Sequence, residues 1–368
     1  MLLGAGRRVA VPLGLYGFVL HAVFGKAYSL VPAYFDRQLR PARAPAVHLP
    51  LALVGVAGLA AGASGFAPDS ARALGAICWG AGVAVFLGTM LVTLWGNLAG
   101  GETGTGEHNA DRRPLDRVAN AAVPAVFAYL GAGAYLTAAG ATPLPIPLDG
   151  YPPRASHLLA VGGAVLLVFA VGFRLFPRFL VADIDRRLAA PVLVAGAVAP
   201  LLLAVGLPAG PLLEAGAILE SLAVVGFAGA YTVLFARSER DRLGFYGPLA
   251  GVGCGVGVVA AGIWFAFGGL DAGLVAGHYR LGLAGFLGLT VVGVTYQFYP
   301  PAVARFPLAG DRLATGALGG LFVGLLVEVV GLVVGLALLV TGGRALGLAG
   351  GLAYAYLVVG LFVQRALD

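Results

Sequence analysis

The chain is a succession of long apolar runs separated by short polar segments. Each run is about 20 residues long, the length that an α-helix needs to cross the hydrocarbon core of a bilayer. Buried β-strands are much shorter than this, at about 4–8 residues. The pattern therefore predicts an all-α, polytopic transmembrane helical bundle of about 11 spans. We expect the spans at 9–34, 46–66, 72–97, 118–141, 155–178, 189–207, 211–236, 245–269, 276–300, 314–341 and 345–365.

Prolines interrupt one of these runs. Pro191, Pro200, Pro208 and Pro211 lie in or directly after the sixth apolar run. Proline removes a backbone donor and clashes with the preceding turn. The segment 189–211 is therefore predicted as either two short helices or one kinked helix.

Composition supports a membrane protein. Hydrophobic residues make up 60% of the chain and charged residues only 11%, whereas soluble domains carry roughly 25% charged residues. So apolar a chain must be solvated by lipid, and we treat residues 1–368 as a single integral membrane domain. Cys78 and Cys254 both lie in apolar runs, which favours small core residues over a disulfide or metal framework.

The basic residues are distributed unevenly between the two sides. The chain has one lysine, Lys26, and its arginines lie mainly in short loops, which argues against nucleic-acid binding. Odd-numbered loops hold fourteen arginines, against five in the N-terminus and the even-numbered loops, which are Arg7, Arg8, Arg72, Arg154 and Arg344. Because positive loops stay inside, we expect a multi-pass protein of the cell membrane with its N-terminus outside and its C-terminus in the cytoplasm.

The longest loop, 98–117, is rich in glycine, threonine and charge. We expect a flexible, solvated cytoplasmic linker there. Glu107 and His108 are neighbours in this loop, but one histidine beside one glutamate is weak support for a metal site.

Three segments of the chain look alike. They run from His21 to Pro32, from His157 to Phe179 and from His278 to Pro301, and the first and third share the spacing G-x-x-Y-x-x-x-P. They fall on spans one, five and nine. The period of four helices predicts repeat modules at 9–141, 155–269 and 276–365, in a pseudo-threefold 4+4+3 arrangement.

Each repeat carries a histidine. His157 and His278 precede their prolines by similar distances, so helix rise places them within about 3 Å of the same depth. Two imidazoles at one depth on neighbouring helices can clamp the iron of a b-type haem. The alternative is that both are interfacial histidines at helix starts.

The other histidines are harder to place. His21 lies about 15 Å deeper if the prolines align, and it is a separate ligand, a partner for a haem edge or propionate, or a core histidine. His48 begins the second span, and we expect it at the interface.

Ionisable residues inside spans suggest a second kind of chemistry. Glu220, Glu328, Lys26 and Tyr296 are candidates for a proton path, because an acid within the bilayer is costly and often functional. The alternative for the two acids is a hydrogen bond to a neighbouring helix. Glu214 is interpreted as structural.

The repeat motif resembles a known family. The pattern H…G-F-L-G-L-T-V-V-G-V-x-Y-x-F-x-P from His278 to Pro300, with its echo from His157 to Pro177, resembles the metal-bearing helices of haem–copper oxidase catalytic subunits. The likeness is greatest to the nitric-oxide-reductase-like and cbb-type branches and to the haem-containing membrane proteins of nitric-oxide response. These subunits have twelve helices in three arcs, and removing the first leaves eleven. The resemblance implies haem ligation by His21 and His278, and a copper-side or haem-side role for His157.

The chain departs from that family at the copper site. The family needs an adjacent histidine pair on the helix after the middle metal helix, and residues 191–207 contain no histidine. Copper is therefore unlikely, and at most one haem is expected. The functions implied are electron transfer, sensing of nitric oxide or oxygen, or an accessory role beside a respiratory or redox partner, and enzymatic activity is left open. The alternatives are a cofactor-free accessory subunit and a transporter that uses the buried glutamates.

Overall fold

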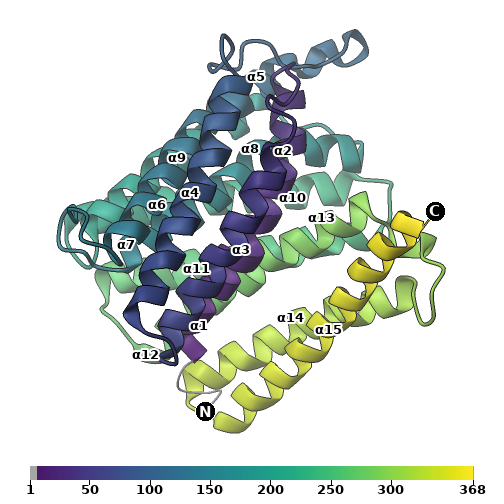
Figure 1. The fold of residues 1–368 in the computed structure, drawn as a ribbon. Helices are drawn as coiled ribbons and strands as arrows, with labels where there is room; N and C mark the ends of the chain where they lie inside the picture. The colour runs from purple at the N-terminus through teal and green to yellow at the C-terminus, as the bar shows by residue number, and fades with distance from the viewer. Residues whose placement is uncertain (1–5, 368) are drawn as a thin grey trace. The chain divides into compact units, whose positions relative to one another are not determined.

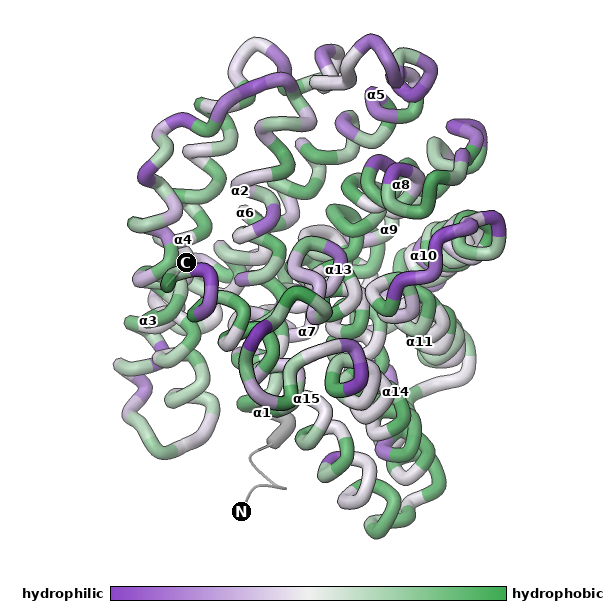
Figure 2. Tube along the Cα trace, turned by 90° about the vertical axis from the view of Figure 1, so that its right-hand side faces the viewer, coloured by the Kyte–Doolittle hydropathy of each residue, from purple (hydrophilic) through white to green (hydrophobic). Residues whose placement is uncertain are grey.

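A computed structural model describes residues 6–367 of the chain. The regular structure of this part is entirely helical, and eleven of its segments are long and apolar enough to cross a membrane. Figure 2 shows hydrophobic residues along the helices and hydrophilic residues concentrated in the connections. The predicted bundle of eleven spans is thus confirmed.

Most spans are single helices, and three contain a π-helical segment. Span one is α1 (Gly6–Val11), η1 (Pro12–Val19) and α2 (Leu20–Tyr34); spans two and three are α3 (Ala44–Ser64) and α4 (Asp69–Thr93); span four is η2 (Glu107–Arg112), α5 (Arg113–Ala121) and α6 (Val123–Ala139). Span five is α7 (Pro153–His157), η3 (Leu158–Val165) and α8 (Leu166–Leu180); spans six to eight are α9 (Arg186–Gly206), α10 (Pro211–Arg237) and α11 (Leu243–Phe267). Span nine is α12 (Ala272–Arg280), η4 (Leu281–Leu289) and α13 (Thr290–Phe298), followed by the short η5 (Pro301–Val303), and spans ten and eleven are α14 (Asp311–Val334) and α15 (Ala337–Leu367).

The turn between the last two spans lies earlier than predicted. α14 ends at Val334 and is capped by Gly335, whose φ of 73° is a left-handed conformation that glycine adopts without strain. α15 then begins at Ala337. Arg344, which was counted as a loop residue, therefore lies about two turns inside the last span.

The proline-rich sixth span forms one continuous helix. α9 begins after Asp185, whose side chain accepts a hydrogen bond from the backbone N–H of Arg187, and it contains both Pro191 and Pro200. Two short helices were one of the two predicted forms, and that form is wrong. Pro191 is the sixth residue of the helix, so it removes one backbone N–H donor from the second turn.

The described chain forms two compact units. The first extends to Arg178 and includes Ile184–Ala223; the second comprises Phe179–Asp183 and the chain from Val224 onward. The first unit thus holds the helices from α1 to α9, which Figure 1 shows from purple to teal, and the second holds α11 to α15, shown in green and yellow. The three repeat modules remain a prediction.

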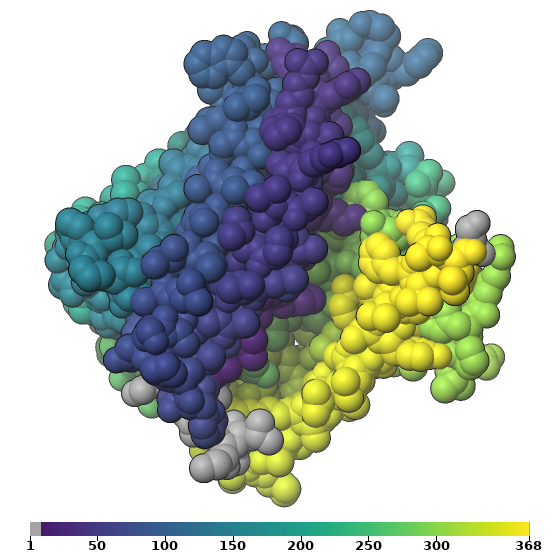
Figure 3. All heavy atoms as spheres, in the orientation of Figure 1, coloured from purple at the N-terminus to yellow at the C-terminus, as the bar shows by residue number. Residues whose placement is uncertain are grey.

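Glycine allows close helix packing in the second unit. α14 and α15 form an antiparallel hairpin (Figure 1), in which a β-carbon on Gly324 would lie 2.5 Å from the backbone nitrogen of Gly347. A β-carbon on Gly343 would collide with the backbone of Glu328. The hairpin therefore depends on small residues at its contact, as is common between membrane helices. α15 is the least buried span, and Figure 3 shows its atoms in yellow on the surface.

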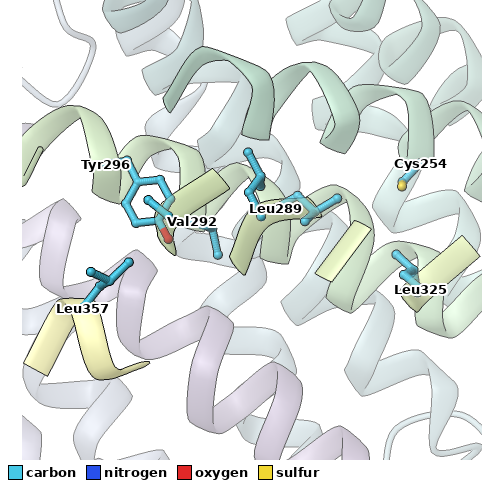
Figure 4. Packing of buried hydrophobic residues seen from close by; sticks show 8 residues of the cluster. Cys254, Leu289, Val292, Tyr296, Leu325 and Leu357 are labelled. Atoms are coloured by element: carbon cyan, nitrogen blue, oxygen red, sulfur yellow. The ribbon is translucent and has the colours of Figure 1, made fainter. Parts of the chain in front are cut away.

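The core of the second unit lies between α11, η4, α13, α14 and α15. Figure 4 shows its buried side chains, which include Cys254, Leu289, Val292, Tyr296 and Leu357. Cys254 is 4% exposed, so its prediction as a small core residue is confirmed.

Candidate functional site

The three predicted repeat helices share a structural feature that sets them apart from other spans. Among the described residues, π-helical segments occur only as η1, η3 and η4, which lie in spans one, five and nine. In such a segment each N–H bonds to the carbonyl five residues back, as Leu166 does to Val161. Short π-helical segments are frequent at functional sites. The coincidence with the sequence repeat supports a common origin for these three spans.

A histidine lies next to each π-helical segment. His157 directly precedes η3, His278 lies shortly before η4, and His21 follows η1 by two residues. The helical geometry of each repeat therefore changes beside its imidazole.

The three imidazoles also share one hydrogen-bonding arrangement. The Nδ1 atom lies 2.9 Å from the Tyr16 carbonyl in His21, 2.7 Å from the Pro153 carbonyl in His157, and 3.0 Å from the Val258 carbonyl in His278. A carbonyl oxygen only accepts, so Nδ1 carries the proton and donates it. In a neutral ring the lone pair is then on Nε2. This is the tautomer that metal-ligating histidines adopt when a backbone carbonyl orients them.

His21 lies beside a group of packed aromatic rings in the first unit. Its ring centroid is 6.3 Å from that of Trp79, and Tyr16 packs edge-on against Trp79 at 5.0 Å. The Tyr16 hydroxyl is 2.8 Å from Oγ1 of Thr137, which fixes that ring. Both His21 Nε2 and Trp79 Nε1 are buried without a hydrogen-bond partner. Because buried polar groups are normally satisfied, this acceptor and this donor point to a ligand or a bound water.

His48 is a correction to the sequence analysis. It was expected at the interface, but it is only 4% exposed. Its Nδ1 is 3.1 Å from the Tyr28 hydroxyl, and its ring packs edge-on against Phe24 at 4.7 Å. Tyr28, its polar partner, lies on span one. The sequence around residue 48 contains no feature that predicts this contact.

The predicted pair of His157 and His278 is divided between the two units. His157 belongs to the first unit and His278 to the second. Each has the ligand tautomer described above, and a shared haem remains a prediction.

A buried ion cluster in the first unit was missed by the sequence analysis. Asp116 is fully buried and is paired with Arg178 at 2.7 Å and with Arg174 at 3.3 Å. Arg174 is 3% exposed and also donates to the Asn120 side chain. Two arginines with one carboxylate can sit in the interior because each charge has partners. Asp116 is far in the sequence from the two arginines, so only the fold brings it to them.

This cluster organises the long loop. Thr105 Oγ1 donates to Asp116 at 2.5 Å, and Arg174 donates to the Thr103 carbonyl at 2.7 Å. Asn97 adds bonds to the Phe35 and Glu102 carbonyls. The expectation of a solvated linker at 98–117 is therefore wrong for its buried residues. Glu107 pairs with Arg113, while His108 is exposed on η2.

The intramembrane acids have contrasting surroundings. Glu220 on α10 is 8% exposed, and its Oε2 has no hydrogen-bond partner. Glu328 on α14 is 1% exposed and is held by Arg280 at 2.5 Å and Arg344 at 2.8 Å. Glu328 thus contacts neighbouring helices, as the structural alternative expected.

The remaining members of the predicted proton path lie in both units. Lys26 belongs to the first unit with Glu220, whereas Tyr296 belongs to the second unit with Glu328. The Tyr296 ring is in the core, 5.8 Å from that of Tyr354, and its hydroxyl is buried without a partner. The path remains a prediction.

Across residues 6–367, no cluster of three or more His, Cys, Asp or Glu side chains is arranged to hold a metal ion. The donors that the fold does offer are single imidazoles. Single imidazoles suit an iron porphyrin, because its ring supplies four ligands and the protein adds one or two axial ones. The buried, unpartnered Nε2 of His21 fits that role.

Comparisons with known proteins leave the family open. No model of a known protein family matches the chain. No curated protein matches it significantly.

Proposed function

We propose that this membrane protein binds one b-type haem, with one or two of its repeat histidines, His21, His157 and His278, as axial ligands. The observation that carries the proposal is the shared state of His21, His157 and His278, each of which bonds a carbonyl through Nδ1 and so directs its lone pair to Nε2. The π-helical segment beside each histidine and the buried, unpartnered Nε2 of His21 add support.

The residues of the chain would hold and orient the group. Backbone carbonyls of Tyr16, Pro153 and Val258 keep each ring in the ligand tautomer. The rings of Trp79 and Tyr16 pack beside His21 and would contact the bound group on that side. When bound, a haem supplies one-electron transfer or binding of a diatomic gas. Both uses match the resemblance to haem–copper oxidase catalytic subunits without their copper chemistry.

The distribution of arginine predicts the orientation of the protein in the membrane. The excess of arginine in the odd-numbered loops favours an external N-terminus and a cytoplasmic C-terminus in the cell membrane. A respiratory or redox partner protein would exchange electrons with the haem, or receive its signal.

An absorption spectrum tests the haem. The protein should be expressed with haem supply, purified in detergent and examined for a Soret band, followed by reduction with dithionite. We expect a Soret band in the wild type, and its loss or shift in at least one of His21→Ala, His157→Ala and His278→Ala. His108→Ala is the matched control because this histidine is exposed. A wild-type protein without a Soret band, or ligand variants that behave like His108→Ala, would contradict the proposal.

One observation favours a second function. Oε2 of Glu220, which is buried without a hydrogen-bond partner, is suited to carry a proton in a transporter or proton-coupled carrier. Glu220→Gln should then abolish proton movement in reconstituted vesicles, whereas Glu214→Gln should leave it unchanged. Equal activity of both variants would remove Glu220 from such a path.

A further inference from the structure

The second unit contains a charge triad formed by Arg280, Glu328 and Arg344. Oε2 of Glu328 accepts from Nη2 of Arg280 at 2.5 Å and from its Nε at 3.0 Å. Oε1 accepts from Nε of Arg344 at 2.8 Å. One carboxylate thus serves two guanidinium groups, and the triad keeps one net positive charge.

All three members lie at a similar depth. Arg280 is about two turns from the start of span nine, Glu328 about two turns from the end of α14, and Arg344 about two turns from the start of α15. Two turns correspond to about 11 Å along each helix. By topology these helix ends lie on one side of the bundle, so the triad lies below the helix ends and close to the headgroup region.

The positive charge of the triad reaches the surface. Glu328 is 1% exposed, but the side chains of Arg280 and Arg344 are 33% and 39% exposed. The other acid near these helix ends is Asp271, whose carboxylate caps α12 by accepting from the Leu274 N–H. An uncompensated charge at this depth is costly. An anion beside the two guanidinium groups would remove that cost.

The surface beside Arg344 combines a charged side chain with exposed apolar side chains. Leu348 and Leu352 follow Arg344 at four-residue spacing, so they share its face of α15 and lie further from the helix end. They are 64% and 63% exposed. A charged donor near the headgroups, followed by a leucine stripe that runs inward, matches a phosphate with acyl chains attached.

We propose that Arg280 and Arg344, held by Glu328, bind the phosphate of an anionic phospholipid whose acyl chain lies along Leu348 and Leu352. Guanidinium groups bind phosphate oxygens through paired N–H donors. Gly343 makes the site possible, because only a residue without a side chain lets α15 approach close enough for Arg344 to reach Glu328. The site does not depend on a haem.

Lipid titration tests this site. Delipidated protein in dodecyl maltoside is titrated with dioleoylphosphatidylglycerol, and bound lipid is counted by native mass spectrometry. Arg344→Gln should weaken binding by about tenfold or more, since a charge-assisted hydrogen bond contributes about 1.5–3 kcal/mol. Arg312→Gln is the matched control, because Arg312 is an exposed arginine at the opposite end of α14. Equal affinity of the two variants would overturn the proposal.

Further arms identify the chemical group and guard against misfolding. Dioleoylglycerol, which lacks phosphate, should not compete, and millimolar inorganic phosphate should not displace the lipid. Displacement by inorganic phosphate would assign the site to free oxyanions and overturn the lipid part. Should Arg344→Gln not fold, Arg344→Lys can be used in its place. This variant keeps the positive charge but loses the paired N–H donors of the guanidinium group, and we expect roughly threefold to tenfold weaker binding of the lipid. Unchanged affinity of a folded Arg344→Lys would contradict the phosphate geometry.

Discussion

At the scale of single residues, the largest effects belong to charges removed from water. Asp116 is fully buried and pairs with Arg174 and Arg178. Removing one partner of a buried pair leaves the other charge uncompensated, which typically costs 3–5 kcal/mol. Asp116 therefore joins the loop and the start of span four to the end of span five.

We expect Asp116→Asn to lower the free energy of unfolding by about 3 kcal/mol, because Arg174 would remain buried without an anion. Unfolding in mixed micelles with increasing dodecyl sulfate measures this change. Asp111→Asn makes the same substitution at an exposed position of the same loop and should change stability little. Comparable losses in the two variants would show that Asp116 is not a special anchor.

A second residue-scale effect depends on pH. The Arg154 guanidinium beside Asp149 holds the pKa of that carboxyl well below its usual value, and the Tyr151 N–H adds to this. A lowered folded-state pKa gives stability that is present above the unfolded pKa, near 4, and is lost as pH falls through the folded value. We expect the melting temperature to fall below about pH 4 in the wild type.

Asp149→Asn should remove that part of the pH dependence, and Arg154→Gln should do the same because it breaks the same pair. Melting curves from pH 6 to pH 2.5 provide the measurement. Arg154 also donates to the carbonyls of Ala204 and Val205, so Arg154→Gln should be less stable at every pH. A wild-type pH profile retained in both variants would rule out this ion pair as its source.

At the scale of elements, the contact between α14 and α15 depends on which glycines lie too close to the other helix to carry a side chain. A β-carbon at Gly343 would collide with the Glu328 backbone, whereas one at Gly342 would meet nothing within 4 Å. Gly343→Ala should destabilise the α14–α15 hairpin by about 1–3 kcal/mol. Gly342→Ala should be neutral or slightly stabilising, since alanine favours helix.

Unfolding of these adjacent variants in dodecyl sulfate tests the contact directly. Loss of phosphatidylglycerol binding in Gly343→Ala would accompany the loss of stability, because Arg344 would move away from Glu328. A Gly343→Ala protein as stable as Gly342→Ala would mean that the two helices do not touch at this point.

The membrane-spanning helices could be predicted from the sequence because the length of its apolar run defines each one. The eleven spans follow from runs of hydrophobic residues, and most ends shift by only a few residues. The π-helical segments were not predictable, because one additional residue per turn leaves no mark on an apolar pattern. The folded loop was not predictable either, since Thr105 and Asp116 are buried by Arg174 and Arg178 from a distant span.

At the scale of the whole molecule, orientation can be tested by labelling. In a background of Cys78→Ala and Cys254→Ala, we expect Leu148→Cys to react with a membrane-impermeant maleimide in intact cells. His108→Cys should react only after the cells are opened, because the arginine bias places loop 98–117 inside. Both positions are exposed, so accessibility differs only by side. The reverse labelling pattern would invert the topology.

The candidate site was predictable only in part. The repeat pointed to His21, His157 and His278, and in the structure Nδ1 of each lies within hydrogen-bond distance of a backbone carbonyl. Arg280 and Arg344 were not recognised as partners of Glu328, because they come from separate spans. Sequence periodicity identifies residues on related helices, but it does not identify which unrelated helices meet.

The π-helical segments give these spans an unusual tolerance to shortening. Such a segment stores a surplus residue relative to an ordinary helix. Deleting one residue from η4 would let a regular helix replace it. Because the wider turn had absorbed the surplus residue, the parts on either side would keep nearly the same orientation about the helix axis, whereas a deletion in a regular α-helix rotates them by about 100°. Single-codon deletions should therefore be tolerated better in these three segments than in the neighbouring regular helices.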